Sequence, residues 1–240
     1  MCGRYSLVTP AEKWAQFFDV NPDSALLDPP RYNIAPGQPV VAVRSAKEPF
    51  STREVVKLRW GLVPGWAKDP KIGHRLVNAR AESLAEKPAF ESALRRRRCL
   101  IVADGFYEWS GPAGRRRPHY VHRRDGAPFA IAGLWERWRG PASDTPASGT
   151  PIETCTLVTT KANGTLCALH DRMPALLDPS EYAAWLGRPG QEAEPAALAP
   201  LLRPCPDDWL LVHEVGMHVN DARFDAPECI APLRTGALVS

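Results

Sequence analysis

The sequence of 240 residues lacks an apolar run long enough to cross a bilayer, and no charged and then apolar leader follows Met1. Its six cysteines include no C-x-x-C pair, and this scattered spacing in a chain of this length is typical of a reduced protein. We therefore expect a cytoplasmic protein that makes no membrane contact.

Two further absences exclude common cofactor and metal sites. The sequence contains neither G-x-x-x-x-G-K-[ST] nor G-x-G-x-x-G, so nothing favours a nucleotide-phosphate loop. His213 and His218 resemble a zinc protease motif but are five residues apart, and a helix would not place both on one face. We therefore expect no metal and no cofactor.

Lysine is scarce, because only seven of the thirty basic residues are lysines and the rest are arginines. The arginines include two runs, Arg95 to Arg98 and Arg115 to Arg117. Guanidinium groups bind phosphate in a bidentate manner, so a nucleic-acid partner is one interpretation. A general enrichment in arginine, with the runs as solvated faces, is equally consistent with the sequence.

Helix signals are few, and two of them share one pattern. Thr9-Pro10-Ala11-Glu12 and Asp178-Pro179-Ser180-Glu181 each match a capping box with proline at the first helical position. The first precedes Trp14, Phe17 and Phe18, and the second precedes another aromatic cluster, so both helices should present an aromatic face to the core.

Strands are expected to outnumber helices and do not alternate with them regularly. This order favours an α+β fold, with a mainly antiparallel β-sheet or barrel core and flanking helices. We expect a single domain over residues 1–240, with a mobile proline- and serine-rich loop at about 139–151. The expected strands are Val40–Arg44, Val55–Trp60, Cys99–Val102, Phe106–Trp109, Tyr120–Arg123, Phe129–Leu134, Thr154–Thr159 and Trp209–His213, and further helices are expected over Ala89–Arg97 and Ala196–Leu202.

Cys2 directly follows the initiator methionine. If Met1 is removed, one residue carries both a free α-amine and a thiol. The amine has a reference pKa of about 7.7 to 8.0, against about 10.4 for lysine, so it can attack an aldehyde near neutral pH. The thiol can then close onto the imine carbon and form a five-membered thiazolidine ring. Many chains carry a cysteine at this position without such a role.

Four short blocks combine reactive, polar and aromatic side chains. They are Cys2-Gly3-Arg4; Arg31-Tyr32-Asn33-Ile34-Ala35-Pro36-Gly37; Trp60-Gly61-Leu62-Val63-Pro64-Gly65-Trp66 with Asn78-Ala79-Arg80-Ala81-Glu82; and Gly105-Phe106-Tyr107-Glu108-Trp109 with His170-Asp171-Arg172-Met173-Pro174. In this order they closely resemble the SOS response-associated peptidase family, whose members sense abasic sites in single-stranded DNA and shield them by crosslinking. The resemblance runs from Cys2 to Asn220, although some members carry a second tryptophan at the position of Ala67.

The resemblance implies a catalytic role for four residues. Cys2 is the nucleophile, and Asn78 orients its amine or holds the opened sugar. Glu108 takes part in abasic-site processing and in release of Met1, and its aromatic neighbours predict a raised pKa. His170 moves protons during sugar-ring opening and carbinolamine dehydration.

Six further residues are assigned to DNA by the same resemblance. Arginines neutralise phosphates beside the lesion, tryptophans stack on neighbouring bases, and the turn after Tyr32 lines the entrance to the pocket. These residues are Arg4, Arg80, Trp66, Trp109, Asn33 and Pro36.

Together these features predict a monomer that binds single-stranded DNA and reacts once with an abasic site through an exposed aminothiol at Cys2. It would associate with the nucleoid when bound to DNA. Loss of Met1 could be autocatalytic, and a weak lyase activity could accompany the Schiff base. Two alternatives stay open: a cysteine peptidase that uses Cys2 against protein substrates, and a noncatalytic nucleic-acid-binding module.

Overall fold

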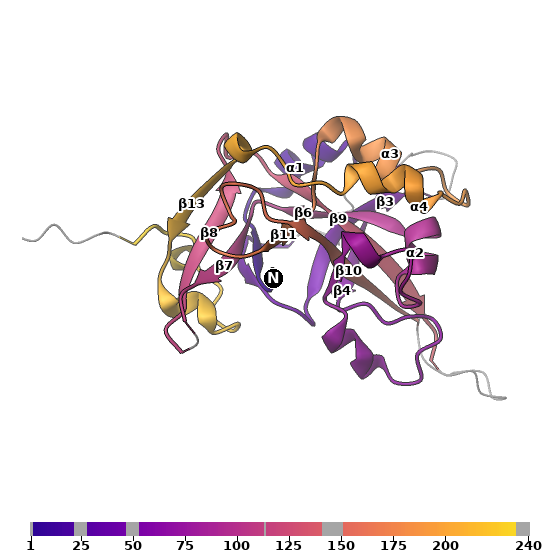
Figure 1. Cartoon of the computed structure of the whole chain (residues 1–240), viewed down its shortest axis with the longest axis horizontal. Coiled ribbons are helices and arrows are strands. Elements are labelled where there is room, and N and C mark those ends of the chain that lie inside the picture. The colour runs from indigo at the N-terminus through magenta and orange to yellow at the C-terminus, as the bar shows by residue number, and fades with distance from the viewer. Residues whose placement is uncertain (1, 22–27, 47–52, 113, 141–150, 234–240) are drawn as a thin grey trace, which may run out of the picture.

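The strands form two sheets that lie side by side along the long axis of the molecule (Figure 1). The computed structural model describes residues 2–21, 28–46, 53–112, 114–140 and 151–233. The smaller sheet has the order β13-β8-β7-β1-β2. Its strands are β1 (Tyr5–Leu7), β2 (Arg31–Ile34), β7 (Gly105–Ser110), β8 (Arg117–Arg123) and β13 (Leu210–Glu214).

The larger sheet closes into a barrel, because β10 pairs with both β4 and β9. Every pair around this ring is antiparallel except β4 with β10. The ring strands are β3 (Pro39–Ser45), β4 (Arg53–Trp60), β6 (Arg98–Ala103), β9 (Phe129–Trp138) and β10 (Ile152–Lys161), and the short strands β5 (Asn78–Arg80), β11 (Arg172–Pro174) and β12 (Leu176–Leu177) are added to them. The α+β fold with a mainly antiparallel barrel is thus confirmed.

All eight strands expected from the sequence are present, with slightly different ends. In β6, every residue is buried, as a continuous apolar run between packed layers requires. One buried cluster contains residues from both sheets, so the two sheets share a hydrophobic core. Residues 141–150 of the expected loop lie outside the described residues, and the strands on either side, β9 and β10, pair antiparallel.

The helices are short and flank the barrel, with α1, α3 and α4 along the upper edge of Figure 1. Their bounds are α1 (Ala11–Phe18), α2 (Glu91–Arg96), α3 (Tyr182–Leu186) and α4 (Pro195–Leu198). The rings of Phe18 and Tyr182 stack at 5.4 Å, so the aromatic faces of α1 and α3 meet. Phe17, by contrast, is 51% exposed, and its expected place in the core is wrong.

The two predicted capping boxes have different outcomes. Asp178 accepts from the backbone of Ser180 while Glu181 accepts from the backbone of Asp178, so the second box is present. The first is absent, because α1 has Pro10 rather than Thr9 at its N-cap and no side chain caps it. The Thr9 hydroxyl donates to the Asp104 carboxylate at 2.8 Å. None of the helices in the described ranges is both long and apolar enough to span a membrane.

Candidate active site

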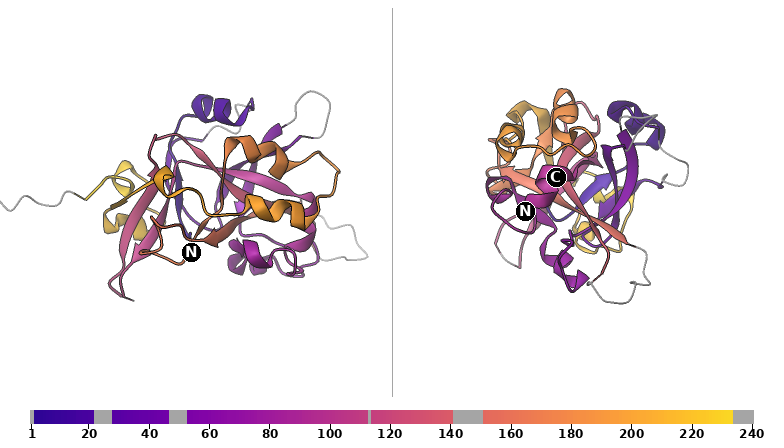
Figure 2. Two further views of the ribbon diagram at one scale, coloured as in Figure 1. Left: turned by 45° about the horizontal axis from the view of Figure 1, so that its top comes forward. Right: turned by 90° about the vertical axis from the view of Figure 1, so that its right-hand side faces the viewer.

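Strand pairing places Cys2 beside Glu108. In the antiparallel pair of β1 and β7, Tyr5 lies opposite Phe106, and the Tyr107 amide donates to the Arg4 carbonyl at 3.0 Å. Continuing this register toward the chain start puts Gly3 opposite Glu108. Cys2, the next residue, then lies diagonally across from Glu108. The segment that leads into β1 accordingly lies between the two sheets in Figure 1 and in the left view of Figure 2.

The Cys2 side chain is fully buried, so the expectation of an exposed thiol is wrong. Its Sγ atom lies 3.6 Å from the Arg4 carbonyl oxygen. Burial raises the pKa of the Cys2 thiol far above its ordinary value, and the charge of Glu108 raises it further. The thiol is therefore held protonated. In this arrangement a free amine at Cys2 would be the more reactive nucleophile.

Asn78 holds the backbone of Cys2 from the barrel side. It begins β5, which pairs with β10 through Leu157. The Asn78 Nδ2 atom donates to the Cys2 carbonyl oxygen at 2.7 Å. Its Oδ1 atom is buried and has no hydrogen-bond partner among the described residues, so it can accept from an added N–H or O–H donor. The structure thus brings two of the predicted catalytic residues, Cys2 and Asn78, into contact.

Glu108 is a buried acid, with only 2% of its surface exposed. Burial raises the pKa of Glu108 to about 7, and the nearby Asp171 carboxylate adds to this increase. A carboxyl with this pKa exchanges its proton near neutral pH, which suits general acid–base chemistry. The influence of Asp171 also shows that the His170-Asp171 turn lies within electrostatic range of Glu108.

His170 is half-buried just before β11. Its Nδ1 atom accepts from the Arg172 amide at 2.9 Å, so the neutral ring carries its proton on Nε2. Asp171 also lies 2.8 Å from Nδ1, but it is largely exposed and could accept from that atom only if Nδ1 carried a proton. Burial lowers the pKa of His170, which favours the neutral ring.

One ion pair joins the segments that carry Asn78 and His170. The Arg172 guanidinium binds both carboxylate oxygens of Glu82, at 2.7 and 2.9 Å, and the Thr159 carbonyl at 2.6 Å. Arg172 is buried, so it fixes β11 against the end of β5. Glu82 and Arg172 both belong to the sequence blocks that carry the family resemblance. Their separation along the chain gives no indication that they form an ion pair.

Two of the predicted DNA contacts, Arg4 and Asn33, are engaged within the protein. The Arg4 Nη1 atom donates to Asn33 Oδ1 at 2.9 Å and to the Val219 carbonyl at 2.6 Å. Asn33 is fully buried, and its amide donates to the carbonyls of Val219, Asp221 and Phe224. Both side chains hold the C-terminal segment here, and DNA contact through them stays a prediction.

The other predicted contacts lie nearer the surface. Trp66 is 61% exposed, and Arg80 and Pro36 are exposed as well. Trp109 is half-buried, and its Nε1 atom donates to Asn220 Oδ1 at 2.8 Å. These four side chains are accessible to a ligand, and their DNA contacts also stay a prediction.

The arginine run at 95–98 is occupied by the protein itself. Arg95 and Arg96 form ion pairs with Glu194 and Glu192, and Arg97 pairs with Glu136. The buried Arg98 donates to four backbone carbonyls around α2 and α3. This run supports the fold, whereas Arg115, Arg116 and Arg117 are exposed on the β7–β8 hairpin.

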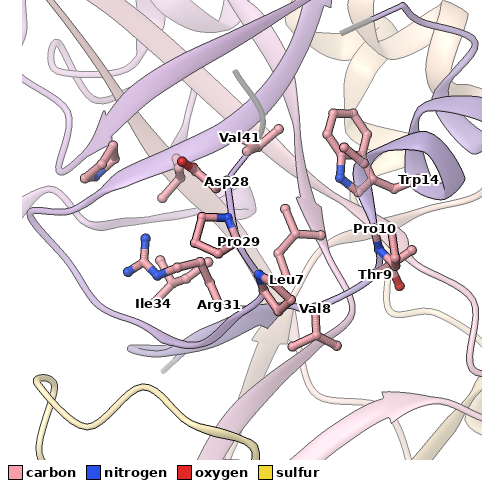
Figure 3. Close-up of a pocket in the computed structure, with 14 residues that line it drawn as sticks. Leu7, Val8, Thr9, Pro10, Trp14, Asp28, Pro29, Arg31, Ile34 and Val41 are labelled. Carbon is pink, nitrogen blue, oxygen red and sulfur yellow. The ribbon is translucent and has the colours of Figure 1, made fainter. Parts of the chain in front are cut away.

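A small cavity lies where the end of β1 leads into α1, lined by Leu7 from the strand and Trp14 from the helix (Figure 3). It encloses about 40 Å³, which is room for one or two waters, whereas ligand pockets hold several hundred cubic ångströms. Its lining includes Leu7, Trp14 and Ile34, which belong to the core. This cavity is therefore not a candidate ligand site.

Comparison with known proteins identifies the family. Residues 1–222 match the profile described as SOS response associated peptidase (SRAP). The chain belongs to this family. The SRAP protein described here is 37% identical to the abasic site processing protein YoqW of Bacillus subtilis, over 96% of this chain and 99% of that protein. It is 30% identical to the abasic site processing protein HMCES of Gallus gallus, over 86% of this chain and 67% of that protein.

Solved structures share the fold of this chain. A crystal structure of a protein from Bacteroides thetaiotaomicron has a TM-score of 0.82 at 25% identity, over 96% of this chain and 99% of that one. A Bordetella bronchiseptica protein has a TM-score of 0.73 at 26% identity, over 90% of this chain and all of that one. The family resemblance predicted from the sequence is therefore confirmed.

Proposed function

We propose that this SRAP protein senses abasic sites in single-stranded DNA and protects them by a covalent thiazolidine bond to Cys2. The observation that carries the proposal is the buried Glu108, with a pKa of about 7, placed beside Cys2 by the pairing of β1 with β7. The names of the SRAP relatives as abasic site processing proteins support the same substrate.

The first step is release of Met1. Glu108 as a base takes a proton from water, which attacks the Met1 carbonyl carbon. The carbon–nitrogen bond to Cys2 then breaks, and the nitrogen receives a proton as it becomes an amine. Because that nitrogen belongs to the residue whose carbonyl Asn78 binds, the new amine forms inside the site.

The second step joins the amine to the opened sugar. The unprotonated Cys2 nitrogen attacks the aldehyde carbon, and the resulting carbinolamine loses its hydroxyl as water to give a Schiff base. Donation by protonated Glu108 or by His170 would assist this loss. The Asn78 Oδ1 atom can accept a hydrogen bond from the amine or from a sugar hydroxyl.

The third step closes the ring. The Cys2 sulfur bonds to the imine carbon while its proton moves to the imine nitrogen, so no further reactant is needed. The raised pKa of the thiol retains this proton until the imine is present. The weak lyase activity expected from the sequence would compete at the Schiff-base stage.

A peptidase that acts on other proteins is less consistent with the site. The Cys2 sulfur is fully buried, and burial raises its pKa, so it is a poor nucleophile toward an external peptide bond. The two functions differ in turnover. A peptidase cleaves many substrate molecules per protein molecule, and a crosslinking protein reacts once.

The decisive experiment is adduct formation with a single-stranded oligonucleotide that carries one abasic site. The processed wild-type protein should give a band that survives denaturation. Cys2→Ser keeps the amine without the thiol, so it should give an adduct that is stable only after borohydride reduction. The matched control, Cys167→Ser, alters an exposed cysteine and should react like the wild type. A stable adduct with Cys2→Ala would contradict the proposal.

A further inference from the structure

Exposed basic and aromatic side chains gather in the segment between β4 and β5. We call Trp66, Lys68, Lys71 and Arg75 the η2 surface, after the turn η2 (Pro70–Arg75) that carries two of them. All four side chains are exposed and line a pocket of about 450 Å³. This volume is in the range of small-ligand sites, but the exposed indole and the cations suit an extended anion better.

The three cations of the η2 surface are available to bind an external anion. Within the described ranges, no ion pair involves Lys68, Lys71 or Arg75. The one acid among them, Asp69, accepts from the Lys71 backbone amide at 2.8 Å. The run at 95–98 differs, because protein groups already bind its arginines.

The backbone beneath this surface is fixed. Trp138 Nε1 donates to the Ala67 carbonyl at 2.7 Å, and the Leu62 amide donates to the Leu76 carbonyl at 3.1 Å. Gly61 and Gly73 approach so closely that a Cβ atom on Gly73 would lie 2.6 Å from the Gly61 oxygen. The cations are therefore presented on a preorganised turn, which lowers the entropic cost of binding.

The η2 surface adjoins the proposed crosslinking site. Arg75 precedes Asn78 by three residues, and an extended chain of three residues spans at most about 11 Å. Asn78 in turn bonds the Cys2 carbonyl. Successive phosphates of a stacked strand are about 3.4 Å apart along its axis, so the second or third phosphate from the lesion would come within reach of Arg75, the cation of this surface nearest to Asn78 in the sequence.

We propose that the η2 surface binds the sugar–phosphate backbone of DNA on one side of the abasic site, with Trp66 stacked on a base. The proposal rests on the proposed function for the position of the lesion. It adds Lys68, Lys71 and Arg75 as phosphate contacts, and it makes the two flanks of the lesion unequal. An acidic protein could satisfy the cations but would leave the exposed indole without a stacking partner.

The test measures binding to a tetrahydrofuran analogue of the abasic site, which has no aldehyde and cannot crosslink. One oligonucleotide extends only to the 5′ side of the analogue, and a second extends only to the 3′ side. The variant is Lys71→Gln/Arg75→Gln. Its matched control is Lys13→Gln/Arg188→Gln, which removes one exposed lysine and one exposed arginine from the edge formed by α1 and α3 (Figure 1).

The test variant should weaken binding to one of the two oligonucleotides. The slope of log affinity against log salt should fall in magnitude by about 1.4 there, because each phosphate contact in a single strand contributes about 0.7. The second oligonucleotide and the control variant should show no change. An equal loss on both oligonucleotides, or no loss on either, overturns the proposal. Adduct formation is measured separately, so failure of the crosslink does not affect this result.

Discussion

Replacement of Glu108 by glutamine should stabilise the protein at alkaline pH. Burial raises the pKa of Glu108 from 4.5 to about 7. The folded protein therefore binds this proton more tightly than the unfolded chain does. The resulting stabilisation is complete below pH 4.5 and is lost as the pH rises through 7. A pKa shift of this size changes the free energy of unfolding by about 3 kcal/mol in total. About 2.5 kcal/mol of this free energy is lost between pH 5 and pH 8.

The assay is urea unfolding of wild type and Glu108→Gln at pH 5 and pH 8, with N-termini matched by mass spectrometry. Glutamine does not ionise, so the variant lacks this loss and its stability relative to wild type should increase by about 2.5 kcal/mol across the interval. Glu86→Gln, which alters an exposed glutamate, is the control and should show no such increase. A wild-type-to-variant difference that is equal at both pH values would refute the reasoning.

The same substitution should remove function. Without an ionisable group beside Cys2, Met1 should be retained, and intact mass measured after expression without added aminopeptidase would show it. In the wild type, the rate of Met1 release should rise with pH through about 7, because the carboxylate form acts as the base. Greater stability together with lost activity would place Glu108 among the groups that a protein retains for chemistry at a cost in stability.

Substitutions at three further positions test how the fold supports the site. Gly105→Ala should lower the urea midpoint by the equivalent of about 2 kcal/mol, because the new Cβ would lie 2.3 Å from the buried ring of Tyr120. Arg98→Leu should cost about 3 kcal/mol in unfolding measurements and leave the salt dependence of DNA binding unchanged, because the lost bonds lie within the protein. Glu82→Gln should slow adduct formation by weakening the ion pair with Arg172, and Glu82→Asp should restore part of the rate, as gel assays over time would show.

The long elements could be predicted because local sequence decides them. β6 is buried throughout and apolar from Cys99 to Ala103, so the apolar pattern indicates it directly. β10 is buried from Thr154 to Thr160, where β-branched and apolar residues alternate or adjoin. The capping box at Asp178 is local too, since all its atoms belong to four consecutive residues. The box at Thr9 is absent because Asp104, from the junction of β6 and β7, accepts from the Thr9 amide and hydroxyl, and the helix has Pro10 at its N-cap.

The short strands were missed, and they carry most of the site. β1 leads from Cys2, β5 begins at Asn78, and β11 begins two residues after His170. Strands of three residues have too little periodicity to be recognised, and they exist here because longer strands provide partners for them. The burial of Cys2 has the same origin. Segments from other parts of the chain cover its side chain, so the residues next to it in the sequence do not predict that burial.

The sequence by itself determined the α+β class and the family, and it supplied the candidate reactive groups, because these depend on local patterning and on residue type. Only the tertiary structure decided that Asn78 bonds to Cys2, that Arg172 binds Glu82, and that the arginines at 95–98 serve the fold. Each of these outcomes joins residues far apart along the chain. Which polar groups meet, and which of them lose water, is fixed only when the sheets have packed.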